Sequence, residues 1–202
     1  MKYAFRLADD DFEYDVLTAV TAYLDCEHYA WLHARNYSHY EILEDGPTTS
    51  RIIQHSKYFG ITFKQHHFRT YLPPSEFTME SDKPFPINTH TTFRPRADGG
   101  THRSVDVSMD LPVVLWPFRK LLAAHLRRYD ARVYGEDAAA AVRREKYLGK
   151  NNWAWAFRPS QFLLHKDAVM EAFRGEIATS RWSKPRTAAE NLHAITSDRP
   201  RP

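Results

Sequence analysis

Six strand-like segments follow one another between residues 37 and 110, with only short turns between them. Each segment is rich in Thr, Ile, Val, Tyr or Phe, which favour extended backbone. The turns include Asp45-Gly46-Pro47 and Asp98-Gly99-Gly100, and such short connections join antiparallel neighbours. The sequence therefore predicts an antiparallel meander of six strands: Tyr37–Glu44, Arg51–Tyr58, Ile61–Tyr71, Glu76–Glu80, Asn88–Arg94 and His102–Asp110.

The segment before the meander predicts one more strand and two short helices. Apolar residues alternate within Lys2–Ala8, which is the period of a strand. Asp9-Asp10-Asp11 comes next, and we expect it at a helix N-terminus, where the free N–H groups favour negative charge. Apolar residues then recur at helical spacing from Phe12 to Leu24, and Asp25–His33 is expected to form a second short helix.

After the meander the hydrophobic period returns to that of a helix. A single long helix is expected over Val113–Lys150, with Gly149 as its C-terminal stop. The aromatic segment Asn151–Arg174 follows and is expected to end in a short helix. From Gly175 onward no period is recognisable. We therefore expect one domain over residues 1–174 and a flexible, basic C-terminal tail over residues 175–202.

The charge of the chain lies in that tail. Lys and Arg number 28 against 25 Asp and Glu, a formal net charge of +3. From residue 181 to the end there are five basic and two acidic residues, so residues 1–180 are balanced. A nucleic-acid-binding surface needs a patch of uncompensated positive charge, so we expect no nucleic-acid partner.

Several compartments and cofactors are excluded by what the sequence lacks. Cys26 is the only cysteine, which excludes an intramolecular disulfide and any cysteine-ligated iron–sulfur cluster held by this chain alone. The apolar runs fall far short of the ~20 residues that span a bilayer, so no stable membrane insertion is expected. No signal-peptide pattern is recognisable, and a cytoplasmic location is expected.

One strand, a pair of short helices, a meander and a long helix form a specific order of elements. This order resembles the START or Bet v 1-like superfamily, also called SRPBCC or helix-grip. The resemblance implies an α+β fold in which a curved antiparallel sheet of about six to seven strands wraps around a long C-terminal helix. It also implies a deep cavity for a hydrophobic or aromatic small molecule, and an aromatic content of 14% suits such a lining.

Within the first helix pair, Asp25, His28 and His33 form the pattern D-x2-H-x4-H. The pattern resembles the iron site in the catalytic domain of Rieske non-heme iron oxygenases, a branch of the same superfamily. By that resemblance the third ligand lies on the long helix, where Glu136-Asp137 and the apolar run after it place Asp137. The resemblance implies Fe(II) on His28, His33 and Asp137, with Asp25 orienting a histidine or relaying electrons.

The geometry of the two histidines sets a condition on this site. On an ideal helix, residues five apart point ~140° from each other. His28 and His33 can therefore converge on one metal only if the helix bends or ends between them. A different source of electrons is also needed, because Rieske clusters are held by two cysteines and two histidines. An oxygenase of this sequence has no Rieske cluster of its own and requires a separate electron donor.

Two metal-free alternatives remain open. The first is an enzyme of the polyketide cyclase or aromatase type, in which cavity residues such as His66, His90 or Tyr71 position a substrate and move protons. Since His66 and His67 are adjacent on an expected strand, only one of the two can face the cavity. The second is a non-catalytic carrier of a lipid or an aromatic metabolite. The sequence leaves the ligand and the oligomeric state open.

Overall fold

A single seven-stranded antiparallel sheet forms the centre of the molecule. The computed structural model describes residues 1–58, 60–83, 86–148, 152–157 and 161–179. The strands lie in the order β1-β7-β6-β5-β4-β3-β2, so six consecutive strands form the expected meander and β1 closes one edge. Their bounds are β1 Lys2–Phe12, β2 Tyr37–Asp45, β3 Thr49–Tyr58, β4 Ile61–Leu72, β5 Glu76–Ser81, β6 Ile87–Pro95 and β7 Thr101–Asp110.

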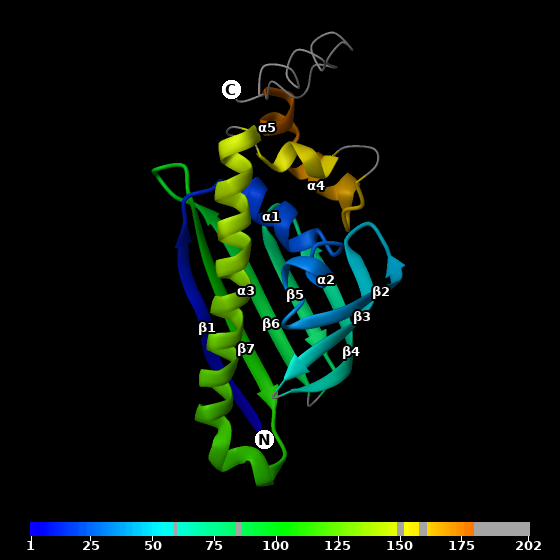
Figure 1. Cartoon of the computed structure of the whole chain (residues 1–202), viewed down its shortest axis with the longest axis vertical. Helices are drawn as coiled ribbons and strands as arrows, with labels where there is room; N and C mark the ends of the chain where they lie inside the picture. Colours follow the sequence, from blue (N-terminus) through cyan, green and yellow to red (C-terminus); the bar gives the residue numbers. More distant parts are fainter. Residues whose placement is uncertain (59, 84–85, 149–151, 158–160, 180–202) are drawn as a thin grey trace, which may run out of the picture.

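The long helix α3, Arg119–Leu148, runs along β1 and β7 on one face of the curved sheet (Figure 1). Its Leu122 and Leu126 pack on a buried apolar cluster that includes Val105 and Val107 of β7. The α-helix was expected to begin at Val113, but it begins later because Val113–Phe118 is a 3-10 helix with Pro117 inside it. Proline lacks the N–H that an α-helix interior needs. The expected stop at Gly149 lies outside the described residues.

The acidic run Asp9–Asp11 is part of β1 and not of a helix start, so that prediction is wrong. β1 continues to Phe12 because every residue from Ala8 onward pairs with β7. The charges are compensated across the pair: His102 lies 3.0 Å from Asp9 and 2.8 Å from Asp11. The helix cap is supplied instead by Asp15, whose carboxylate accepts the N–H of Thr18 at 2.7 Å.

Two short helices follow, α1 at Val16–Leu24 and α2 at Tyr29–Leu32, as the sequence predicts. The C-terminal elements lie at the α1 end of the sheet (Figure 1), where the 3-10 helix at Asn152–Phe157 contacts α1. Their side chains Trp153, Leu164 and Val169 share one buried cluster with Leu17 and Val20 of α1. These elements are the 3-10 helix η2 at Asn152–Phe157, α4 at Lys166–Ala172 and α5 at Arg174–Thr179.

The flexible tail was expected to begin at residue 175, but residues 175–179 are helical and belong to α5. Residues 180–202, the rest of that expected tail, lie outside the described residues. Within the part of the chain that the structure describes, no helix is both long and apolar enough to cross a membrane.

Candidate metal centre

His28 and His33 flank the four-residue helix α2. The two histidines can converge only if the helix bends or ends between them, and α2 is short enough to meet this condition. His28 stands directly before the helix and His33 directly after it. Because the helix ends at Leu32, the two rings are not held on opposite sides, and their centroids lie 5.1 Å apart. Both side chains are almost wholly buried. The short helix therefore brings both imidazoles to one place.

Asp137 reaches the same place from α3. Its Oδ1 lies 3.2 Å from Nε2 of His28 and 3.1 Å from Nε2 of His33. One ligand atom from each of the three residues lies within 4.8 Å of the other two. Two segments more than one hundred residues apart thus meet at the three side chains that the sequence motif singles out.

Each histidine is oriented by a second carboxylate on its other nitrogen. Nδ1 of His28 lies 3.1 Å from Oδ2 of Asp25, and Nδ1 of His33 lies 2.6 Å from Oε2 of Glu136. A carboxylate that accepts the Nδ1 proton leaves the lone pair of Nε2 directed at the centre, as in many metal-bound histidines. The role of Glu136 was not predicted, although its place beside Asp137 in the acidic pair was a usable signal.

The charges of the centre are strongly coupled. Burial disfavours a charged His28 imidazole, but the carboxylates of Asp137 and Asp25 outweigh burial and raise its pKa to about 9. Burial also disfavours a charged Asp137, yet its contacts with His28 and His33 dominate and lower its pKa. The ligand set therefore holds an ionised carboxylate in a site closed to bulk water.

These residues fit a divalent metal ion. Nε2 of His28 is buried and has no hydrogen-bond partner, since its short distance to Asp137 lacks the direction of a hydrogen bond. An octahedral metal with bonds of about 2.1 Å holds neighbouring ligand atoms about 3.0 Å apart, close to the 3.2 Å and 3.1 Å that separate Oδ1 of Asp137 from the two Nε2 atoms. Two imidazoles and one carboxylate are the facial donor set of non-heme Fe(II) sites. The orphaned nitrogen would gain its missing partner from such an ion.

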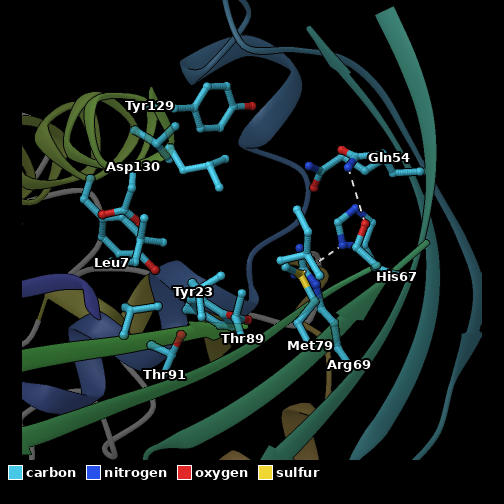
Figure 2. Close-up of a pocket in the computed structure, with 18 of the residues that line it drawn as sticks. Leu7, Tyr23, Gln54, His67, Arg69, Met79, Thr89, Thr91, Tyr129 and Asp130 are labelled. Atoms are coloured by element: carbon cyan, nitrogen blue, oxygen red, sulfur yellow. Dashed lines mark hydrogen bonds between the residues drawn. The ribbon is translucent and has the colours of Figure 1, made fainter. Parts of the chain in front are cut away.

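The centre borders a cavity with a volume of about 150 Å³ between the sheet and α3 (Figure 2). Asp137 belongs to its lining, together with Tyr29, which packs on both histidine rings. In Figure 2, Gln54, His67 and Arg69 lie on one side of the cavity, and Tyr129 and Asp130 of α3 lie on the other. Apolar residues complete the lining: Leu7, Ile87, Val105, Val107, Leu126 and Val133.

His66 and His90 do not face this cavity, so their predicted role as cavity residues is wrong. Side chains alternate along a strand, and on β4 the buried positions are Gln65, His67 and Arg69. His66 is exposed on the outer face. His90 is likewise exposed on β6, where its Nε2 lies 3.0 Å from Oε2 of Glu76.

The alternation on β4 also identifies side chains that sequence reasoning missed. His67 takes the cavity position, and burial, with lesser contributions from Arg69 and His66, lowers its pKa to about 3. Its ring is therefore neutral near pH 7. Arg69 lines the cavity two residues further along the strand. Tyr71 is buried, but its hydroxyl donates to the carbonyl of Pro74 at 2.7 Å.

The sheet, the short helix pair and the long helix define a helix-grip fold. No protein-family model matches the sequence, and no curated protein matches it significantly. Solved structures match at low identity. The Zhui aromatase/cyclase from Streptomyces sp. R1128 is 13% identical, with a TM-score of 0.64 over 74% of this chain and 99% of that one. Ara h 8.0201 is 13% identical, with a TM-score of 0.56 over 71% and 99%.

A third match extends further along this chain. Dicamba monooxygenase bound to 3,6-dichlorosalicylic acid is 14% identical, with a TM-score of 0.58 over 98% of this chain and 61% of that one. The described C-terminal helices α4 and α5 fall within this alignment. At such identities the matches establish the fold alone, so the expected helix-grip fold is confirmed.

Proposed function

We propose that this protein is a mononuclear non-heme iron enzyme of the oxygenase type, acting on an apolar or aromatic small molecule. The observation that carries the proposal is the convergence of His28, His33 and Asp137 on one point beside the cavity. The carboxylates of Asp25 and Glu136 on the outer nitrogens support it. The fold match with a monooxygenase over 98% of the chain is consistent with it.

Fe(II) would be held by Nε2 of His28, Nε2 of His33 and a carboxylate oxygen of Asp137. When bound in such a facial triad, it supplies the activation of dioxygen next to a substrate. The chain's own residues prepare the site. Asp25 and Glu136 hold the two Nδ1 protons, and the apolar wall of Val105, Val107 and Leu126 excludes water and packs against an apolar substrate.

Electrons would come from a donor outside this sequence. A Rieske cluster needs two cysteine ligands, and Cys26 is the only cysteine of this sequence. Cys26 is itself unsuited to redox chemistry, because burial raises the pKa of its thiol to about 11. The reductant would therefore dock on the outside of this chain.

The metal-free cyclase is the alternative that the aromatase/cyclase match favours. It no longer has His66 and His90 as acid–base groups, because both lie on the outer surface. His67 would have to replace them. A carrier would need neither the metal nor an acid–base group. These two alternatives share the cavity with the oxygenase and differ from it in metal binding.

Anaerobic equilibrium dialysis against Fe(II), with Co(II) absorption spectra as a second readout, tests the proposal. We expect one metal ion per chain, lost in H28A, H33A and D137A. E136Q should retain the ion with an affinity about 10- to 100-fold weaker, since such orienting groups typically contribute that much. H90A on the outer face is the matched control and should bind normally. Absence of stoichiometric binding, or full occupancy in H28A, would leave only the metal-free alternatives.

A further inference from the structure

Arg69 is buried, and none of the residues that the structure describes places a carboxylate in an ion pair with its guanidinium. Its Nε and Nη1 are buried and have no hydrogen-bond partner. Its nearest aromatic neighbours are Tyr23, Tyr29 and Tyr40, whose ring centres lie 5.7 to 5.9 Å from Cζ. Aromatic rings attract the flat face of a guanidinium but do not accept its N–H groups in the plane. A buried charge in this state is unfavourable unless something else completes its bonds.

The described residues of the cavity do not supply the missing anion. Two carboxylates line the cavity, and both are bound to other groups. Asp130 pairs with Arg103, with Oδ2 2.6 Å from Nη2. Asp137 lies between the two histidines. Besides His67 and His165, the groups that act electrostatically on Arg69 are tyrosines and Cys26. Burial raises the pKa of Tyr29, of Tyr40 and of the Cys26 thiol, which disfavours their charged forms.

Further unsatisfied polar atoms lie on the same strand. Oε1 of Gln65 and Nε2 of His67 are buried without a hydrogen-bond partner, as are the two nitrogens of Arg69. All three side chains point from β4 into the cavity. Figure 2 shows His67 and Arg69 on the side across from α3. One wall of the cavity is thus a polar strip. The wall formed by β7 and α3 carries the apolar side chains Val105, Val107, Leu126 and Val133 beside its tyrosines and the two paired carboxylates.

The strip is connected to the metal centre through one side chain. Tyr29 packs within 4.6 Å of the His28 ring and 5.5 Å of the His33 ring, measured between ring centres. The same ring lies 5.9 Å from Cζ of Arg69. A ligand anchored at Arg69 therefore extends into a space that Asp137 also borders.

We propose that the ligand of this cavity is an aromatic or apolar carboxylic acid whose carboxylate binds the guanidinium of Arg69. Arg69 then gains charged hydrogen bonds at nitrogens that lack a partner. The ring of the acid lies against Val105, Val107 and Leu126, and its far end approaches the centre at Asp137. The inference rests on the proposed binding of an apolar or aromatic molecule, but not on the metal.

Matched pairs of acid and amide test it, because they differ in charge and hardly in shape. Benzoate and benzamide, and 2-naphthoate and 2-naphthamide, are titrated calorimetrically into metal-free protein and again into the Co(II)-loaded protein. We expect each acid to bind at least about tenfold tighter than its amide, the usual minimum for a charged hydrogen bond. R69M should abolish this preference, because methionine offers the carboxylate neither a charge nor a hydrogen-bond donor. R94M, on the exposed face of β6, is the control and should keep it.

A second measurement separates recognition from a structural role. The ligand-free R69M protein should melt at the same temperature as the wild type or higher, because an unpaired buried charge is removed. R69K retains a charge and should retain part of the preference. A lower melting temperature of R69M, together with an acid preference that survives in R69M, would make Arg69 structural and overturn the inference.

The outcomes also distinguish this inference from the proposed iron enzyme. Equal affinity for acid and amide in the wild type, or an acid preference that survives R69M, overturns the inference even if Fe(II) binds. Acid preference without any metal binding upholds it and rejects the iron enzyme. If neither the acids nor the neutral amides bind, both the inference and the proposed occupancy of the cavity are wrong.

Discussion

Two buried arginines in this protein have similar aromatic surroundings and opposite electrostatic ones. Arg103 of β7 stacks on Tyr134, with Cζ 3.3 Å from the ring centre, and pairs with Asp10 and Asp130. Arg69 of β4 lies among three tyrosines and has no carboxylate partner within the described chain. Neighbouring aromatic rings therefore do not distinguish a structural arginine from one that is available to a ligand. The distinction lies in whether carboxylate oxygens already accept the N–H groups of the guanidinium.

The partners of Arg103 explain why it is structural. Asp10 comes from β1 and Asp130 from α3, so one guanidinium joins the edge of the sheet to the long helix. These carboxylates raise the pKa of Arg103 above its usual range, although burial opposes the charge. Arg69 ties no two elements together by a hydrogen bond that the structure records. Its removal should therefore affect binding more than folding.

The largest expected effect comes from breaking the Arg103 pair. D130N keeps the shape of the side chain but leaves the guanidinium with Asp10 alone. We expect the free energy of unfolding in urea to fall by about 3 kcal/mol, because removing one partner strands a buried charge. The control is D106N, which breaks the exposed pair of Asp106 with Arg6 and should lose less than about 1 kcal/mol. Equal losses in the two variants would remove the distinction between Arg103 and Arg69.

The next effect is a dependence of stability on pH, which arises from the lowered pKa of His67 and to which Arg69 contributes. Burial is the larger cause, and the charge of Arg69 adds to it, so that the pKa of His67 falls to about 3 in the folded protein. The unfolded chain binds this proton below a pKa of about 6.5. Stability is therefore full above pH 6.5 and falls as the pH drops towards 3, by about 2 kcal/mol at pH 5.

H67Q isolates this contribution, because the other histidines remain. Urea unfolding at pH 7 and pH 5 should show a smaller loss in H67Q than in the wild type. R69M should also reduce the loss, by less than H67Q does, since burial of His67 persists. Identical pH dependence in all three proteins would mean that Arg69 exerts no electrostatic effect on its neighbour.

A carboxylate introduced by mutation beside Arg69 would give it an ion-pair partner, as Arg103 already has. Met79 lies directly opposite Arg69 on β5 and lines the cavity. M79E places a carboxylate there, and we expect the affinity for benzoate to fall about tenfold, because the new ion pair competes with the ligand. M79Q is the control for the loss of the thioether. Calorimetry that finds the same benzoate affinity in M79E and M79Q would contradict the ligand role of Arg69.

The sequence predicts the fold well because short turns and alternation are local signals. All six expected strands of the meander exist, with ends within two residues of their predicted positions. Asp9–Asp11 was misplaced because its compensation depends on His102 and Arg103, which are far away in sequence. Local preference for a helix start was outweighed by pairing with β7.

The three residues of the candidate metal centre were predictable for a different reason, since the family resemblance singles out His28, His33 and Asp137 before any geometry is known. The cavity residues were harder, because a shift of one position on a strand exchanges inside for outside. That shift separates the predicted His66 from the observed His67. Arg69 lies two residues after His67 and therefore faces the same side of the sheet, but no sequence signal indicates that its guanidinium lacks a partner.

The smallest effect, and the sharpest comparison, comes from replacing each arginine by lysine. Lysine keeps the charge but cannot form the two-pronged bond with Asp130, so R103K should lose about 1 kcal/mol for each hydrogen bond given up. R69K gives up no recorded hydrogen bond, and we expect its free energy of unfolding to stay within about 0.5 kcal/mol of the wild type. Urea unfolding without ligand measures both. If R69K and R103K lost comparable free energies of unfolding, the packing of the tyrosines around Arg69 would require the planar guanidinium. Arg69 would then have a structural role and not a ligand-binding one.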